Sequence, residues 1–244
     1  MASQLDGLAF WLTTVNIGMV EIAHRLGFRE CVVDAEHGVF NPADLDKLVV
    51  LCNALDIRLL IKVWGPEAIP IQQALDLGAD GVVIPHIKDV EHAQEITATA
   101  KFPPLGSRSF AGGRTTGYGA PESDYFNQQD RNTVCLPMIE SAEALRDVVE
   151  ILALDTVDGV FVGPSDLSLS RGRPGYAFTD DDKSDLRTVA AAAIAAQKPW
   201  IMPAWTPDER TFARQLSATS IVVIHEFAAL TAGIQATLNE VISS

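Results

Sequence analysis

Short apolar runs recur along the chain, and each is followed by a longer stretch that mixes apolar and polar residues. The runs are nearly continuous in Val, Ile and Leu, which is typical of parallel strands buried on both faces. Eight such runs are present, at residues 8–12, 30–34, 58–63, 81–86, 133–140, 159–164, 199–205 and 220–225. We expect each of them to form a buried strand.

The stretches between these runs carry helical patterns, most clearly at residues 42–55, 67–78, 141–154 and 208–217. Pro42 suits a first helical position, and Gly27 and Gly78 suit helix C-caps. Eight alternations of strand and helix in 244 residues predict an α/β fold, the (β/α)₈ TIM barrel. No linker interrupts the chain, so we expect one domain over residues 1–244. An open doubly wound sheet is the alternative, but no glycine-rich phosphate fingerprint follows the first strand.

One connection, at residues 101–132, is longer than the others. It is rich in Gly and contains Arg108 and Arg114. Long connections within compact domains are usually functional or disordered. We expect the region around these two arginines to cover a site.

The composition narrows the possible partners and the compartment. A hydrophobic content of 48% suffices for a large core, and a net charge of −14 disfavours binding to nucleic acid or an anionic membrane. The start of the chain has no signal-peptide pattern, and no apolar run approaches the roughly 18 residues of a membrane span. Cys31, Cys52 and Cys135 have no paired spacing, which favours reduced thiols and a cytoplasmic location.

Polar and aromatic residues gather where the predicted strands end, which is where TIM barrels place their active sites. They are Trp11, Asp34, Glu36, His37, Lys62, His86, Glu140, Asp166, Trp205 and His225. Glu140 and Asp166 form a carboxylate pair at neighbouring strand ends, and such oxygen ligands suit Mg²⁺ or Mn²⁺. Alternatively, Asp166 caps the next helix and Glu140 lies in a first helical turn. A lone histidine such as His86 is more often structural than a ligand. Trp64, just after the third predicted strand, and Trp205 either line a substrate pocket or simply pack.

Five segments resemble successive signatures of a known enzyme family. They are VVDAEHG (32–38), ALDLGADGVVIPHI (74–87), PPLGSRS (103–109), LPMIES (136–141) and DGVFVGPSDLSLS (158–170). The family is that of the metal-dependent class II pyruvate aldolases of the 4-hydroxy-2-oxoheptanedioate aldolase type, grouped with the citrate lyase β-subunit-like enzymes. The resemblance implies a TIM barrel of the phosphoenolpyruvate/pyruvate type.

The resemblance also implies roles for individual residues. Glu140 and Asp166 would hold a divalent metal, Mg²⁺, Mn²⁺ or Co²⁺. His37 would be the acid/base, oriented by Asp34, with Glu36 supporting the turn between them. Backbone amides around Ser165 and Asp166 would receive the substrate carboxylate at a helix N-terminus.

Two more residues are candidates for contact with the substrate. Trp11 lies at the end of the first predicted strand. By resemblance, Asp76 would approach the site of a neighbouring subunit, because the family forms homo-oligomers, hexamers with helices exchanged between barrels.

The chain departs from the family at Lys62, which stands where these aldolases place an arginine beside the enolate oxygen. Lysine keeps the positive charge but loses the planar two-pronged donor. Two alternatives remain open for Lys62, a Schiff base with a keto acid and a charge that extends into solvent. Met138 stands where a glutamine or another polar residue often approaches the metal.

The function implied is reversible, metal-dependent aldol cleavage of a 4-hydroxy-2-oxo acid to pyruvate and an aldehyde, through a stabilised enolate. The chain would therefore be a carbon–carbon lyase. The alternatives are a lyase that acts on an acyl-CoA or another keto acid, and a barrel that binds a keto acid without catalysis.

Overall fold

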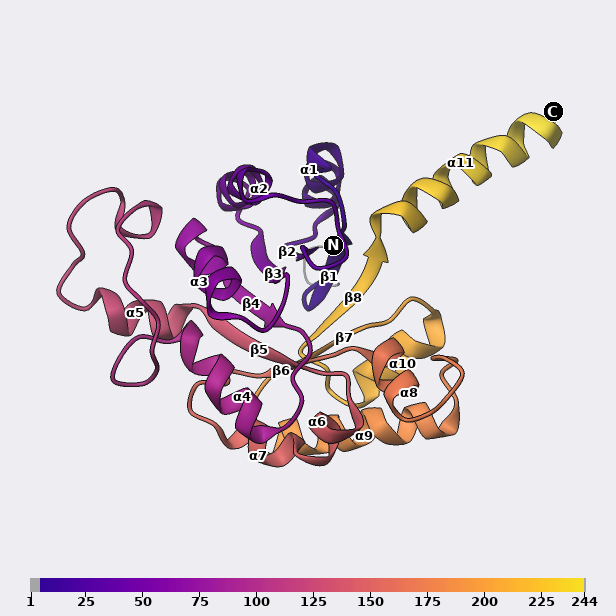
Figure 1. Cartoon of the computed structure of the whole chain (residues 1–244). Coiled ribbons are helices and arrows are strands. Elements are labelled where there is room, and N and C mark those ends of the chain that lie inside the picture. The colour runs from indigo at the N-terminus through magenta and orange to yellow at the C-terminus, as the bar shows by residue number, and fades with distance from the viewer. Residues whose placement is uncertain (1–4, 244) are drawn as a thin grey trace.

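Eight parallel strands close into a barrel in the order β1 to β8 in the computed structural model, which describes residues 5–243 (Figure 1). The strands are β1 (Leu8–Leu12), β2 (Glu30–Asp34), β3 (Arg58–Lys62), β4 (Gly81–Ile84), β5 (Val134–Ile139), β6 (Val160–Val162), β7 (Trp200–Pro203) and β8 (Ser220–His225). The predicted barrel is therefore confirmed, and each strand ends within two residues of its predicted position. Residues 1–4 and 244 lie outside the described part, so the single domain over 1–244 stays a prediction.

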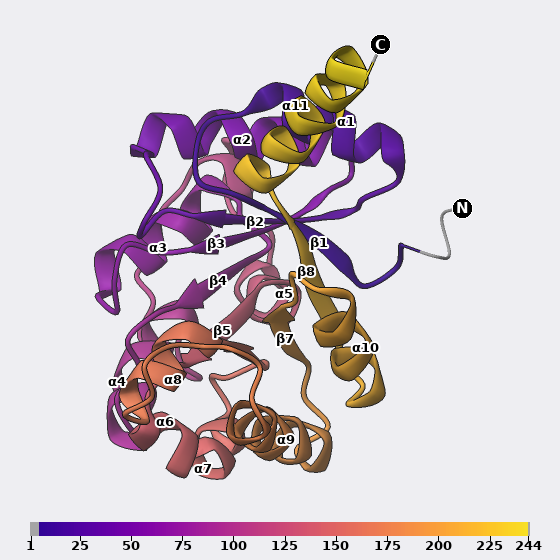
Figure 2. The same cartoon turned by 90° about the vertical axis from the view of Figure 1, so that its right-hand side faces the viewer.

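Helices connect the strands and cover the outside of the barrel, and a last helix, α11, follows β8 (Figures 1 and 2). They are α1 (Ile17–Leu26), α2 (Pro42–Ala54), α3 (Ala68–Leu77), α4 (Val90–Thr97), α5 (Tyr125–Asn132), α6 (Ala142–Arg146), α7 (Val148–Ala153), α8 (Pro164–Ser170), α9 (Asp180–Ala195), α10 (Pro207–Gln215) and α11 (Glu226–Ser243), with 3₁₀ turns η2 (Ala98–Ala100) and η3 (Arg114–Thr116). Gly27 and Gly78 end α1 and α3 with φ of 108° and 99°, the left-handed conformation predicted for helix C-caps. The predicted helix at 141–154 divides into α6 and α7 at Asp147.

The core has two layers, because successive side chains of a strand point to opposite faces. Side chains on the outer face of the strands pack against the helices in the larger cluster. The inner cluster fills the barrel and consists of Ala9, Trp11, Val32, Leu60, Val83, Leu136, Met138, Phe161, Ile201 and Val222. Both faces are apolar, which explains why the strand runs do not alternate in hydrophobicity.

Helix α11 leaves the barrel after β8 and projects away from the body of the molecule (Figure 1). Its first residue is anchored, because the buried Glu226 carboxylate accepts hydrogen bonds from the backbone and side chains of Thr13 and Thr14. Beyond that anchor, Phe227, Leu230 and other apolar side chains are exposed. No helix within residues 5–243 combines the length and apolar character needed to cross a membrane.

The long connection at 101–132 packs along the outside of α2 and α3. Arg108 donates to Asp76 of α3 at 2.8 Å, and Arg114 pairs with Asp46 of α2. In Figure 1 this segment lies at the far side of the barrel from α11. Arg108 and Arg114 thus pair with the outer helices of their own barrel, and the expectation that this region covers a site stays a prediction.

Candidate active site

The chain turns sharply after β2 and uses Asp34 to stabilise the turn. The Asp34 carbonyl oxygen accepts from the Gly38 N–H at 3.0 Å, and its carboxylate accepts from the His37 N–H at 3.1 Å. A side chain at position 38 would collide with the Asp34 carbonyl oxygen, so the turn requires glycine. Asp34 thus contacts the main chain of His37, whose imidazole is exposed at 62%, while Glu36 points inward with 9% of its side chain exposed.

Lys62 lies at the end of β3, directly opposite Asp34 in the β2–β3 register. Only 5% of its side chain is exposed, so the alternative of a charge that extends into solvent is wrong. The Lys62 Nζ lies 2.6 Å from Glu36 Oε2 and 3.7 Å from Asp34 Oδ1. The Lys62 Nζ is thus held by two carboxylates, whereas a Schiff-base lysine must be free to attack the carbonyl carbon of the keto acid. The geometry therefore favours an electrostatic role for Lys62 over a Schiff base.

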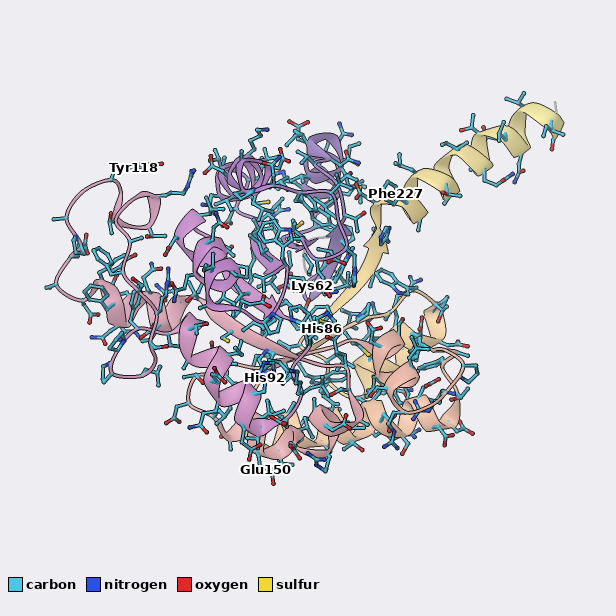
Figure 3. The ribbon with its side chains drawn as sticks, viewed as in Figure 1. Lys62, His86, His92, Tyr118, Glu150 and Phe227 are labelled. Carbon is cyan, nitrogen blue, oxygen red and sulfur yellow. The ribbon has the colours of Figure 1, made fainter. Side chains whose placement is uncertain are left out.

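His86 follows β4 and also reaches Glu36. Its Nε2 lies 2.5 Å from Glu36 Oε1, and its backbone N–H donates to Glu140 Oε1 at 2.6 Å. The residue adopts a φ of 57°, a left-handed conformation that turns the chain back across the mouth of the barrel. Figure 3 shows Lys62 and His86 close together near the middle of the barrel. His86 therefore belongs to a cluster with Glu36, Lys62 and Glu140 at the barrel mouth, whereas the sequence favours a structural role for a lone histidine.

Glu36 is the carboxylate on which these cations converge. Burial raises its pKa, but the hydrogen bond and positive charge of Lys62, together with His37 and His86, outweigh burial and hold the pKa below its usual range. Glu36 is therefore present as a carboxylate at neutral pH.

Glu140 follows β5 and is buried, with 5% of the residue exposed. Burial raises its pKa, and the negative charge of Asp166 raises it further against the opposing effects of the His86 N–H and Lys62. Asp166 lies in the first turn of α8 and is exposed. The Glu140 carboxylate lies against the backbone of Gly163, the residue before α8. An added Cβ at position 163 would lie 2.7 Å from Glu140 Oε2, so this close packing requires glycine.

A cavity of about 540 Å³ lies beside the two carboxylates. Its lining includes His86, Lys88, Glu140, Asp166 and Ser170. A space of this size accommodates a small organic acid next to Glu140 and Asp166.

Glu140 and Asp166 both border this cavity and are the candidate metal ligands. Within residues 5–243, no group of three or more His, Cys, Asp or Glu side chains is arranged to hold a metal ion. Two carboxylates with open positions for water and substrate fit Mg²⁺ or Mn²⁺, whereas a structural zinc needs four protein ligands. The raised pKa of Glu140 is consistent with this fit, because a cation would stabilise its charged form.

The structure leaves several of the other candidates apart from this cluster. Trp11 packs inside the barrel with its ring 5.9 Å from that of Phe161, and Asp76 pairs with Arg108 on the outer surface. Ser165 is exposed at the start of α8, beside Asp166. Met138 is buried in the inner core beneath Gly163.

Two aromatic residues and a histidine complete the set of strand-end candidates. Trp64 packs partly buried against the core. Trp205 stacks edge-on with His225 at 6.2 Å, and both border an apolar groove at the base of α11. None of the three has a described contact with Glu36, Lys62 or Glu140 among residues 5–243.

Comparison with known proteins shows which family the chain resembles. Residues 8–203 match the family described as HpcH/HpaI aldolase/citrate lyase. The chain is 33% identical over 173 residues to the hydroxypyruvate/pyruvate aldolase of Roseobacter denitrificans, covering 70% of this chain and 67% of that protein. It is 32% identical over 196 residues to the 2-keto-3-deoxy-L-rhamnonate aldolase of Klebsiella pneumoniae, covering 78% and 73%.

Solved structures show the same fold. The HpcH/HpaI aldolase from Desulfitobacterium hafniense superposes with a TM-score of 0.89 at 23% identity, covering 97% of this chain and 92% of that one. At this level of identity the likeness concerns the barrel alone.

Proposed function

The chain belongs to the HpcH/HpaI aldolase/citrate lyase family, and we propose that the residues at its barrel mouth carry out aldol cleavage of a 4-hydroxy-2-oxo acid. As a member of that family the chain is a carbon–carbon lyase, and its class of reaction is metal-dependent cleavage of a 2-oxo acid to pyruvate and an aldehyde. One observation carries the assignment of residues. A buried cation, Lys62, and a carboxylate pair, Glu140 and Asp166, meet at one end of the barrel beside a cavity.

Glu140 and Asp166 would hold the divalent metal, Mg²⁺, Mn²⁺ or Co²⁺. A divalent cation supplies positive charge that stabilises the enolate formed when the bond between C3 and C4 breaks. The support for this assignment is the donor set, which consists of two oxygen ligands with room for a bidentate keto acid and water.

The remaining residues bind the substrate, act on it or position a residue that does. We assign Lys62 to the enolate oxygen, where a fixed ammonium stabilises developing negative charge. His37 takes the proton from the C4 hydroxyl in cleavage and returns it in condensation, with Asp34 holding the turn that presents it. Amides at Ser165 and Asp166 receive the substrate carboxylate. Trp11 packs in the inner core of the barrel, and we retain it as a candidate for contact with the substrate from that side.

We also propose that the chain works as a homo-oligomer, a hexamer in which α11 packs on a neighbouring barrel. The exposed apolar side chains of α11 support this proposal, since single exposed helices rarely carry them without a partner. Asp76, on the outer surface, would then approach the site of the neighbour. The three free, buried cysteines support a cytoplasmic location, and the net charge supports the absence of nucleic acid and membrane partners.

Exchange of the pyruvate methyl protons with deuterium tests this function without knowledge of the aldehyde. Forming and reversing the enolate replaces those protons with deuterium from heavy water. The methyl signal of pyruvate should therefore disappear from the proton NMR spectrum when the metal-loaded protein is present. A chelator should stop the exchange, and restored metal should return it. Exchange that continues after chelation would contradict the metal-dependent enolate.

A further inference from the structure

We propose that Glu36 is a positioning residue that fixes the Lys62 ammonium for the reaction, and that His86 holds Glu36 in place. The inference rests on the proposed role of Lys62 at the enolate oxygen. Glu36, Lys62 and His86 come from the ends of β2, β3 and β4, and Glu36 bridges the other two side chains. Lys62 and His86 are labelled in Figure 3.

The contact between Glu36 and Lys62 is the shorter of the two ion pairs that Lys62 makes. Glu36 Oε2 lies 2.6 Å from Nζ, whereas Asp34 Oδ1 lies at 3.7 Å. The lysine stem has four rotatable carbons, so its ammonium takes its position from the group that binds its end. Both side chains are nearly inaccessible to solvent, at 9% and 5%, and the pair is therefore screened far less than a surface ion pair.

His86 fixes the other oxygen of the same carboxylate. Its Nε2 lies 2.5 Å from Glu36 Oε1, so each Glu36 oxygen has its own cationic or donor partner. His86 is itself fixed, because its backbone N–H donates to Glu140 Oε1. The bridge thereby ties the position of the lysine to the carboxylate that would hold the metal.

Glu36 is not needed for the turn in which it lies. The amides of His37 and Gly38 donate to the Asp34 carboxylate and carbonyl, and Val39 donates to the Thr13 carbonyl oxygen. The described hydrogen bonds of this turn therefore do not involve the Glu36 side chain. Its carboxylate pairs most closely with Lys62 and His86, at 2.6 and 2.5 Å, and His37 Nε2 lies at 3.5 Å from the oxygen that holds Lys62. Glu36 thus contacts three side chains of the barrel mouth, which is the arrangement of a group that positions others.

A double-mutant cycle between Glu36→Gln and Lys62→Met tests the inference. Lys62→Met should lower kcat for pyruvate release by roughly 10–10³-fold, the scale of a single oxyanion donor.

Glu36→Gln keeps the size of the side chain but removes its charge, and should lower kcat by roughly 10–100-fold. KM should rise by less than about threefold, because loss of a negative charge does not weaken binding of an anionic substrate. In the Lys62→Met background, Glu36→Gln should change kcat by less than about twofold.

Variants of His86 provide the second arm. His86→Ala should lower kcat, and His86→Gln should retain at least about three times more activity, since the glutamine amide nitrogen can take the place of Nε2 and donate to Glu36. His92→Ala is the matched control, because His92 lies on the following helix and accepts from the Lys88 N–H without contacting Glu36. Thermal unfolding of each variant shows that it is folded.

The outcomes separate this inference from the proposed function. Absence of pyruvate release from the wild type would count against the function. A wild type that loses activity with Lys62→Met but not with Glu36→Gln would overturn the positioning role alone. Equal losses from Glu36→Gln in both Lys62 backgrounds would also overturn it, because Glu36 would then act independently of the lysine.

Discussion

Glu140 is a buried carboxylate at the barrel mouth, with 5% of the residue exposed. It accepts the His86 N–H, and the negative charge of Asp166 acts on it together with the positive charge of Lys62. A carboxylate in this position keeps its charge at the lowest free-energy cost when a cation is bound beside it.

Replacing Glu140 should therefore affect metal binding and catalysis together. We expect Glu140→Gln to lower the affinity for Mn²⁺ and the rate of pyruvate release, each by at least about tenfold, because an amide oxygen is neutral. Titration calorimetry with Mn²⁺ and a steady-state assay measure the two effects. Glu143→Gln, an exposed carboxylate on the rim of the same cavity, is the control. Unchanged Mn²⁺ affinity in Glu140→Gln would show that the metal assignment is wrong.

The exposed imidazole of His37 can be removed without disturbing the fold, so its assignment as the acid/base can be tested directly. Because 62% of the side chain is exposed, His37→Ala should leave the unfolding temperature and Mn²⁺ affinity unchanged. The rate of aldol cleavage should fall by about 10²–10⁴-fold, the usual contribution of a general acid–base group. A loss of less than about threefold would indicate that His37 has no part in proton transfer.

The sequence places most of this cluster, because strand ends of a barrel meet on one face. Asp34, Lys62 and Glu140 follow from that rule. The roles of Glu36 and His86 do not, since they depend on a positive φ at His86 and on the direction of a side chain within a turn. The burial of Lys62 could not be predicted either, because sequence periodicity does not indicate whether a charged side chain at a strand end turns inward.

At the scale of elements, a buried ionic cluster holds α8 against α9 near the carboxylate pair. The Asp182 carboxylate accepts from Ser168 at 2.7 Å and from the Thr179 N–H at 2.8 Å, and it pairs with Arg173 at 2.7 Å. Burial alone would raise its pKa, but the hydrogen bonds from Ser168 and Thr179 outweigh it and lower the pKa to about 2. The sequence does not show this cluster, which forms only when α8, α9 and the connection between them pack together.

The cluster makes a pH-dependent contribution to stability. Asp182→Asn should lower the free energy of unfolding at neutral pH by about 1.5–3 kcal/mol, the range for hydrogen bonds to charged groups. The folded pKa lies below the ordinary value of 3.8, so the contribution is complete above that value and is lost as the pH falls through about 2. Urea unfolding curves of variant and wild type should therefore converge in acid. Asp181→Asn, on the exposed face of the same helix turn, is the control. A constant difference down to acid pH would contradict the linkage.

At the scale of the whole molecule, α11 is the helix that projects away from the barrel beyond its first residue, Glu226. Phe227, Leu230, Ile234 and Leu238 recur at spacings of three and four residues and are exposed at 47–60%. This spacing forms one apolar face of a helix. Sequence reasoning assigns a helix-exchanged hexamer by resemblance only, because the pattern of one chain shows an apolar face without showing what covers it.

Disrupting that face should change the oligomeric state. We expect Ile234→Glu, or Leu230→Glu with Leu238→Glu, to convert the assembly to smaller species, because each change places a charge in an apolar contact. Size-exclusion chromatography with light scattering measures the mass. Gln235→Glu adds the same charge at a polar position of the helix and should leave the mass unchanged. An identical mass for Ile234→Glu and wild type would show that α11 does not mediate association.

The release of pyruvate from a panel of 4-hydroxy-2-oxo acids tests the central claim most directly. The wild-type protein, loaded in turn with Mg²⁺, Mn²⁺ and Co²⁺, is assayed with each acid, and the pyruvate formed is measured together with the aldehyde. We predict equal amounts of the two products from at least one acid, no release after chelation, and recovery when the metal is restored. Release that is indifferent to chelation, or no release from any acid by a protein that binds both metal and pyruvate, would contradict the assignment of this barrel as a metal-dependent pyruvate aldolase.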